Sequence, residues 1–216
     1  MNFSRRRFLG AVAVGGTGLA MPRALTAGSS GAMGLVLPQP SAPALPAGQT
    51  VPLFTRAMAA LDNHAKWIPN RDAVGIVDFA SPSRDIRFHL LDIVGGKVIS
   101  SHLVAHGRGS DPANSGWVEQ FSNVPGSNAS SQSSFVTGET YIGKHGLSRR
   151  LVGLDPENSL AESRAIVIHA ASYVGNAMAE AQGRIGRSQG CFAVAPEEIV
   201  QLLARLGPGR LLFAAK

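Results

Sequence analysis

The spacing of apolar residues along the chain predicts a helix followed by a series of short strands. Pro52 suits the first turn of a helix, and Leu53, Met58 and Leu61 fall roughly on one face, so a helix is expected over residues 52–68. The apolar runs that follow are short and bounded by Gly, Pro and Ser, which is typical of strands. The predicted strands are 73–79, 87–94, 97–105, 139–143, 149–154, 164–169 and 210–214, and a further helix is expected over 196–206. The pattern predicts a mainly β fold with short helices, of the α+β class.

A long polar stretch, residues 106–134, separates the third predicted strand from the fourth. It is rich in Gly, Ser, Asn and Pro, so no regular element is expected there. Loops of this length inside a compact domain are often functional. The stretch is therefore a candidate for one wall of a binding cleft.

The first 27 residues have the features of an export signal. Ser4-Arg5-Arg6-Arg7-Phe8-Leu9 precedes a short apolar, Gly-rich stretch, and small residues follow near Ala27. This order resembles the twin-arginine signal, whose partner during export is the twin-arginine translocase. A Gly/Pro/Ala-rich linker is expected over 28–50, and a single domain over 51–216. We therefore expect a secreted protein of the periplasm or cell envelope.

Charge and hydropathy argue against two other classes of protein. The formal net charge is +6, but the first 27 residues carry four Arg and no acidic residue, so the remainder is only weakly basic. The sequence has no basic stripe with interleaved aromatic residues, so nucleic acid is not expected as a partner. No apolar run reaches the roughly 18 residues needed to span a bilayer, so no stable membrane span is expected in the mature chain.

The candidate chemistry centres on Cys191, the only cysteine in the chain. Exported proteins tend to pair their cysteines, so a single thiol is inert and buried, joined between chains, or reactive. His169 ends a strongly apolar run upstream, and its imidazolium beside the thiol would form an ion pair that favours the nucleophilic thiolate. The N–H groups of Gly190 and Cys191 would hold the oxyanion of an acyl transfer. The alternative is a small buried Cys191 and a strand-end His169 satisfied by hydrogen bonds.

The same segment resembles the catalytic signature of the YkuD-type L,D-transpeptidases. The likeness is greatest to a divergent murein branch in which Gly-Arg-Ser-x-Gly-Cys recurs, here Gly186-Arg187-Ser188-Gln189-Gly190-Cys191. Other stretches over about residues 73–200 also resemble that branch. They are Ala105-His106-Gly107-Arg108-Gly109-Ser110, Phe121-Ser122-Asn123, Tyr141-Ile142-Gly143-Lys144-His145-Gly146, Val152-Gly153-Leu154 and His169-Ala170-Ala171-Ser172-Tyr173-Val174.

The resemblance implies an L,D-transpeptidase-like β-sandwich and a cysteine acyl-transferase that acts on peptidoglycan tetrapeptide stems. Cys191 is then the nucleophile that attacks the carbonyl between meso-diaminopimelate and the terminal D-alanine, and His169 is the general base. The Ala170 carbonyl orients the imidazole, while Ser188 and Gly190 shape the oxyanion turn. An amine of a second stem resolves the thioester, which gives a 3→3 cross-link or a related amide exchange.

Four residues are further candidates for binding the stem peptide: His106, Arg108, Tyr173 and Arg187. His106 and Arg108 are expected to line the cleft, with Arg108 meeting a carboxylate of the stem. The alternative for these two residues is a solvated loop. Arg187 is either a substrate contact or a surface charge.

Two departures from the better-known family members leave the acyl acceptor open. Those members have Gly where this chain has Ala170, and a basic or Asn residue where it has Ala193. The acceptor is a stem amine, a protein amine or water, and water would make the enzyme an L,D-carboxypeptidase. A catalytically silent wall-binding module is the alternative from another class of protein.

Three histidines, His102, His106 and His145, raise the question of a zinc hydrolase. A strand separates positions i and i+4 by about 13 Å, so His102 and His106 chelate one ion only if the chain bends between them. We therefore expect no metal site, and the sequence has no cofactor motif.

Overall fold

The computed structural model describes residues 51–216. The predicted export signal, 1–27, and the predicted linker, 28–50, lie outside the described residues. Within residues 51–216 the chain forms eight strands, three short α-helices and one 3-10 turn. In chain order these are α1 (Val51–Asn63), β1 (Ala73–Asp78), β2 (Phe88–Asp92), β3 (Lys97–His102), η1 (Arg108–Ser110), β4 (Ser133–Gly143), β5 (Gly146–Gly153), β6 (Val167–Ala170), α2 (Asn176–Gln182), β7 (Phe192–Val194), α3 (Ile199–Arg205) and β8 (Leu211–Ala215).

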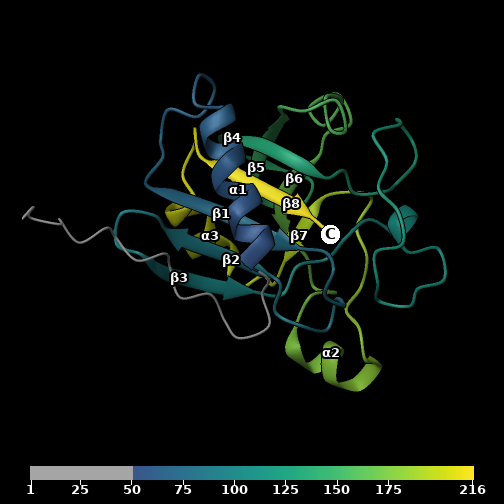
Figure 1. Cartoon of the computed structure of the whole chain (residues 1–216). Coiled ribbons are helices and arrows are strands. Elements are labelled where there is room, and N and C mark those ends of the chain that lie inside the picture. Colours follow the sequence, from purple (N-terminus) through teal and green to yellow (C-terminus); the bar gives the residue numbers. More distant parts are fainter. Residues whose placement is uncertain (1–50) are drawn as a thin grey trace, which may run out of the picture. The chain divides into compact units, whose positions relative to one another are not determined.

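All eight strands belong to one sheet, in the order β3-β2-β1-β8-β4-β5-β6-β7 (Figure 1). Neighbouring strands are antiparallel except for two parallel pairs, β1 with β8 and β6 with β7. The prediction of a mainly β fold with short helices is confirmed.

Strands β1 and β8 are buried on both faces, and their side chains alternate between two apolar clusters. In β8, Leu212 and Ala214 enter one cluster, while Leu211 and Phe213 enter the other. Helix α1 packs on the second cluster and contacts β1 and β8 (Figure 1). Its buried residues recur at helical spacing, which explains why this segment forms an amphipathic helix. They are Leu53, Ala57, Ala60 and Leu61.

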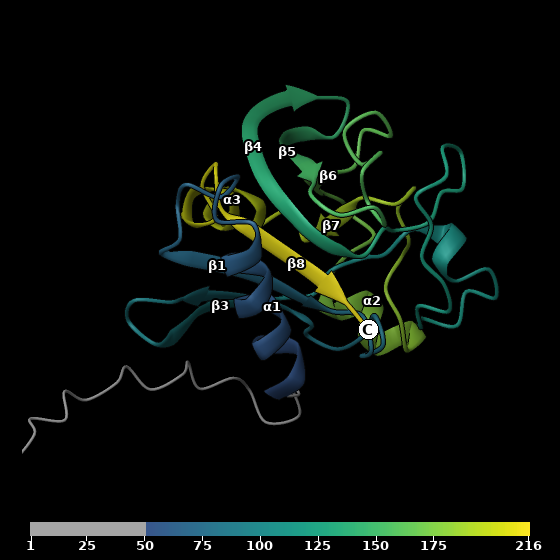
Figure 2. The same ribbon diagram turned by 45° about the horizontal axis from the view of Figure 1, so that its top comes forward.

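The sheet curves strongly along β4, so that its two ends share the first cluster (Figure 2). The pairing of β4 with β5 shifts register between Thr137 and Thr140, and such bulges increase the bend of a strand. Phe79, directly after β1, stacks on Phe192 of β7 with ring centroids 5.9 Å apart. A single sheet thus encloses its own core, with α3 contributing Leu202 and neighbouring apolar residues.

Several predicted boundaries are wrong. The helix expected over 52–68 ends at Asn63, and turns at 64–67 follow, after which Ile68 is buried. The strand expected over 164–169 begins only at Val167, because Ala165 has a left-handed φ of 55°. Strand β4 begins at Ser133, inside the stretch expected to be a loop. Neither α2 nor β7 was predicted.

Candidate active site

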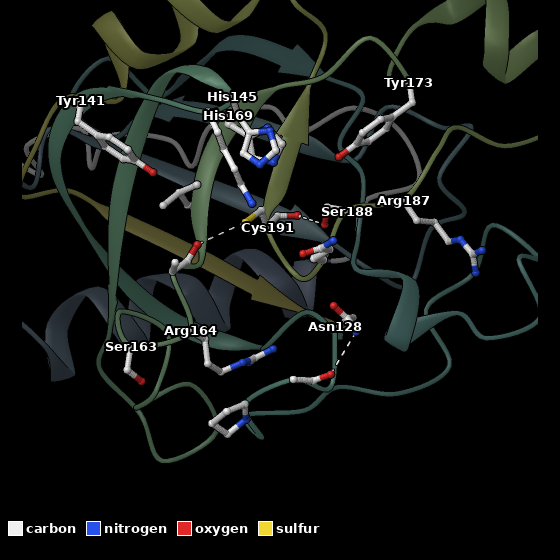
Figure 3. A pocket seen from close by; sticks show the side chains of 16 residues that line it. Asn128, Tyr141, His145, Ser163, Arg164, His169, Tyr173, Arg187, Ser188 and Cys191 are labelled. Carbon is white, nitrogen blue, oxygen red and sulfur yellow. Dashed lines mark hydrogen bonds between the residues drawn. The ribbon is translucent and has the colours of Figure 1, made fainter.

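The sequence candidates Cys191 and His169 line the same cavity, which has a volume of about 500 Å³ (Figure 3). Its walls come from the β4–β5 hairpin, β6 with the segment before it, the loop after β6, the segment before β7, and the long loop. The lining residues are Pro125, Gly126, Asn128, Tyr141, Lys144, His145, Ser163, Arg164, Ala165, Val167, His169, Tyr173, Arg187, Ser188, Gln189 and Cys191. Four other sequence candidates, Ala170, Gly190, His106 and Arg108, do not line it.

The parallel pairing of β6 with β7 brings the histidine and the cysteine together. His169 pairs with Ala193, so Cys191 stands two residues before the partner of the histidine. Successive side chains on a strand alternate between faces, which places positions two apart on the same face. The short β7 strand, absent from the sequence prediction, is therefore what aligns the thiol with the imidazole.

The imidazole of His169 is held by its own strand and by a second histidine. Its Nδ1 donates a hydrogen bond to the Ala170 carbonyl oxygen at 2.8 Å, because a carbonyl can only accept. In the neutral ring Nε2 is then unprotonated and able to accept a proton. The His145 ring stacks on it, with centroids 4.2 Å apart and an interplanar angle of 19°. Burial lowers the pKa of His169, and the nearby charges of His145 and Lys144 act in the same direction.

The Cys191 thiol is half-buried and lies against the turn that precedes β6. Its Sγ is 3.6 Å from the carbonyl oxygen of Ala165, the residue with the left-handed backbone. Burial raises the pKa of Cys191, although the Val167 N–H and the charges of Lys144 and Arg164 partly oppose this. A raised thiol pKa and a lowered imidazole pKa both favour the neutral pair. Both directions run against the preformed thiolate–imidazolium ion pair expected from the sequence.

The turn leading to Cys191 is closed by Ser188. The Ser188 hydroxyl accepts the Gly190 N–H at 3.1 Å and donates to the Cys191 carbonyl at 2.6 Å. Gly190 has φ of 115°, and a Cβ there would lie 2.7 Å from the Ala129 carbonyl oxygen. Only glycine therefore fits this position. Since the Gly190 N–H already has a partner, it is not the free oxyanion donor expected from the sequence.

The segment around His106 and Arg108 supports this turn with its main chain and does not line the cavity. The His106 carbonyl accepts the Ser188 N–H at 2.9 Å, and the Arg108 N–H donates to the Ser188 carbonyl at 2.9 Å. The His106 side chain is fully buried, so it has no access to a ligand. Contrary to the sequence expectation, neither side chain lines the cavity around Cys191.

His106 instead belongs to a buried polar network. Arg87, also fully buried, donates from Nη2 to His106 Nδ1 at 2.8 Å. His106 Nε2 therefore carries the proton and faces Asp111 Oδ2 at 3.3 Å. Burial lowers the pKa of His106 to about 4, and the charge of Arg87 lowers it further, which keeps the ring neutral. The network fixes the start of the long loop behind the cysteine turn.

Arg164 holds the middle of the long loop. Its guanidinium donates to the carbonyls of Ser122 at 2.7 Å and Ala129 at 2.6 Å. It also donates to the hydroxyls of Ser131 at 2.6 Å and Ser127 at 3.3 Å. Because Ala129 packs against Gly190, this side chain connects the loop to the cysteine turn.

The two remaining substrate candidates, Tyr173 and Arg187, both line the cavity. Burial raises the pKa of Tyr173 to about 12, so its hydroxyl is protonated. Arg187 donates to the Asp111 carbonyl, and in Figure 3 its guanidinium points away from Cys191. Sequence reasoning gave no role to Arg164, Lys144 or His145 in this cavity, although the last two lie within a stretch that resembles the family.

The three histidines considered for zinc lie in different surroundings. His102 faces Glu198 at 3.1 Å, His106 contacts Arg87 and Asp111, and His145 stacks on His169. Within residues 51–216 no group of three or more His, Cys, Asp or Glu side chains is arranged to hold a metal ion.

Comparison with known proteins gives a family and a set of structural likenesses. The profile of the YkuD-type L,D-transpeptidase catalytic domain matches residues 47–215. The chain belongs to this family. No curated protein matches the chain.

Solved structures similar to the chain include several L,D-transpeptidases. One from Mycobacterium smegmatis has 12% identity and a TM-score of 0.42, over 67% of this chain and 59% of that one. One from Xylanimonas cellulosilytica has 15% identity and a TM-score of 0.42, over 73% and 68%. The helical cell shape determining protein of Campylobacter jejuni has 8% identity and a TM-score of 0.45, over 78% and 57%. The chain thus spans about three fifths of the first of these proteins.

The described part of the chain contains no helix that is long and apolar enough to cross a membrane.

Proposed function

We propose that this protein is a cysteine L,D-transpeptidase in which Cys191 forms a thioester with a peptidoglycan tetrapeptide stem. The observation that carries the proposal is the alignment of the only cysteine with His169 in one cavity, through the pairing of β6 with β7. The family match supports the substrate class.

The first half-reaction transfers the acyl group to the cysteine. Sγ of Cys191 attacks the carbonyl carbon between meso-diaminopimelate and D-alanine, and the thiol proton passes to Nε2 of His169. The Ala170 carbonyl holds Nδ1–H and so keeps Nε2 free to accept this proton. The Cys191 N–H remains to bind the oxyanion, since the Gly190 N–H is bonded to Ser188. The C–N bond then breaks, the proton passes from His169 to the departing amine, and D-alanine leaves.

The second half-reaction releases the acyl group. An amine of a second stem attacks the thioester carbonyl, gives up its proton to His169, and the thiol is regenerated as the new amide forms. With water as acceptor the same steps yield a free acid, which is the carboxypeptidase alternative. Both reactions use the same residues, so the acceptor is decided by experiment.

The neutral resting pair gives the mechanism a definite order. Because burial raises the pKa of Cys191 and lowers that of His169, the proton moves as the nucleophile attacks. His169 therefore acts as a general base and not as the permanent counter-ion of a thiolate. Export to the periplasm or cell envelope through the twin-arginine translocase is part of the same proposal and rests on residues 1–27.

The test is to incubate defined tetrapeptide muropeptides with the full chain and to analyse the products by mass spectrometry. The variants Cys191→Ala and His169→Gln are incubated in parallel. Loss of D-alanine with formation of dimers, absent from both variants, is the expected result. Loss of D-alanine without dimers would establish the carboxypeptidase instead. An unchanged substrate with the wild-type chain would overturn the enzyme assignment and favour the silent wall-binding module.

A further inference from the structure

The cavity around Cys191 is lined by cationic side chains and by no carboxylate. Three of its lining residues are basic, Lys144, Arg164 and Arg187, and none of the sixteen is Asp or Glu. A cavity with charges of one sign concentrates ligands of the opposite sign. The site is therefore suited to an anionic group.

The two guanidiniums are already used by the protein. Arg164 donates four hydrogen bonds to the long loop, including those to the Ser122 and Ala129 carbonyls. Arg187 donates to the Asp111 carbonyl and points away from Cys191 (Figure 3). Arg164 is therefore committed to the loop, and the Arg187 guanidinium is directed away from the thiol.

Lys144 differs from both. Its ammonium has no hydrogen bond or salt bridge with any residue that the structure describes, and it is exposed at the cavity rim. It lines the same cavity as Cys191 and His169, and its positive charge lowers the pKa of both groups.

The hairpin that carries Lys144 is held in place over the catalytic histidine. Lys144 and His145 form the turn between β4 and β5, closed by the pairing of Gly143 with Gly146. The next side chain, His145, stacks on His169 at 4.2 Å. On the β4 side, the Arg150 guanidinium covers the Tyr141 ring at 4.5 Å. These contacts restrict the turn, so the ammonium is presented to the cavity from a defined backbone position.

We propose that Lys144 is a specificity-determining residue that binds the terminal carboxylate of the donor peptide, one residue beyond the bond that Cys191 attacks. This inference rests on the proposed function. In a tetrapeptide stem the D-alanine carboxylate is three bonds from the attacked carbonyl carbon, so it lies within the same cavity as the thiol. A longer stem has an amide at this point and offers the ammonium no charge. Lys144 thereby selects stems that end one residue past the attacked bond.

One test does not depend on the natural substrate. Iodoacetate and iodoacetamide alkylate the same thiolate, so the ratio of their rates is independent of the Cys191 pKa and reports attraction of a carboxylate. Cys191 is the only cysteine, so whole-protein mass identifies the product. In the full chain, Lys144→Met is expected to lower the iodoacetate-to-iodoacetamide ratio about threefold to tenfold, and about 1 M salt is expected to reduce that difference.

Two control variants test whether the ratio depends on the positive charge of residue 144 and on its place in the cavity. Lys144→Arg keeps the positive charge and should keep a raised ratio. Lys97→Met removes an exposed charge from the first residue of β3, outside the cavity, and should leave the ratio unchanged. A ratio in Lys144→Met equal to that of the wild type would overturn the inference.

A second test identifies the carboxylate, using three donors. They are the tetrapeptide stem, the same stem ending in D-alanine amide, and a stem with lysine in place of diaminopimelate. Lys144→Met should lower kcat/KM about tenfold for the first and third donors and leave it unchanged for the amide. An equal loss with the amide, or no loss with the lysine stem, would overturn the assignment to the terminal carboxylate. If the wild-type chain consumes none of the donors while its iodoacetate preference remains, the proposed function fails and the anion site stands.

Discussion

Replacement of Arg164 should loosen the long loop and weaken the fold, because this one side chain makes four contacts to it. The perturbations are Arg164→Met, which removes both the charge and the donors, and Arg164→Lys, which keeps the charge but replaces the guanidinium fork with one ammonium. In either variant the Ala129 and Ser122 carbonyls lose their guanidinium donor. The lysine ammonium cannot reproduce the planar fork that spans these positions.

The size of the effect follows from the contacts. A hydrogen bond to a charged group contributes about 1.5–3 kcal/mol, but Arg164 is only half-buried, so water replaces part of what is lost. We expect both variants to lower the free energy of unfolding by about 2–4 kcal/mol, measured by urea denaturation. Amide hydrogen exchange should become faster over residues 122–131 in both.

The two Arg164 variants are expected to differ in their effect on the pKa of Cys191. Arg164 lowers the pKa of Cys191, so Arg164→Met should move the midpoint of alkylation to higher pH, whereas Arg164→Lys should not. The matched control is Arg184→Met, since the Arg184 guanidinium makes a single hydrogen bond, to the Gln182 carbonyl at 3.2 Å. If both Arg164 variants unfold at the wild-type urea concentration and the loop keeps its protection, the loop is held by other contacts and this reasoning is wrong.

Three further predictions concern the turn, the buried network and the thiol. Gly190→Ala should destabilise the protein by about 2 kcal/mol more than Gly183→Ala in urea denaturation; both glycines have positive φ, but only at Gly190 does a Cβ meet backbone within 4 Å. Because burial lowers the pKa of His106 to about 4, its contribution to stability is complete above about pH 6.5 and is lost as pH falls toward 4. The loss should reach about 3 kcal/mol, and His106→Gln should flatten the pH dependence of the urea midpoint in that window. Iodoacetamide alkylation of Cys191 should have a midpoint above that of a free thiol; a fast plateau below pH 7 that disappears in His169→Gln would contradict the neutral pair.

The placement of His169 and Cys191 in one cavity could be predicted from the sequence because its signals are local. The apolar run before His169 indicates a strand, and a lone cysteine after a polar Gly-containing turn indicates an exposed backbone corner. The positions of His106 and Arg108 could not be predicted in the same way. A polar string in a long loop has the same composition whether it lines a cleft or supports one, and only the contacts of Arg87 and Asp111 with His106 decide between the two.

The missed elements have identifiable causes. Gly138 and the surrounding Ser and Thr residues conceal the first half of β4, where the register shift lies. Strand β7 has three residues, too few for a periodic signal. Helix α2 did have a signal, since Gly183 follows an Ala-rich segment and adopts the left-handed conformation typical of a helix C-terminus. The first half of β4 and strand β7 depend on pairing with other strands, which the local sequence does not reveal. Helix α2 could have been predicted from its own sequence.

The charge of Lys144 connects the resting state of the thiol to the order of the proposed reaction. In the empty site Lys144 is one of the groups that partly offset the raised pKa of Cys191. A donor carboxylate bound to Lys144 would neutralise that charge, so substrate binding makes the thiolate less favourable and the neutral thiol more so. Proton transfer to His169 must then accompany attack on the carbonyl carbon. The neutral thiol also agrees with the proposed export of an enzyme with one cysteine, because oxidation of cysteine depends on its thiolate fraction and a protonated Cys191 is oxidised slowly.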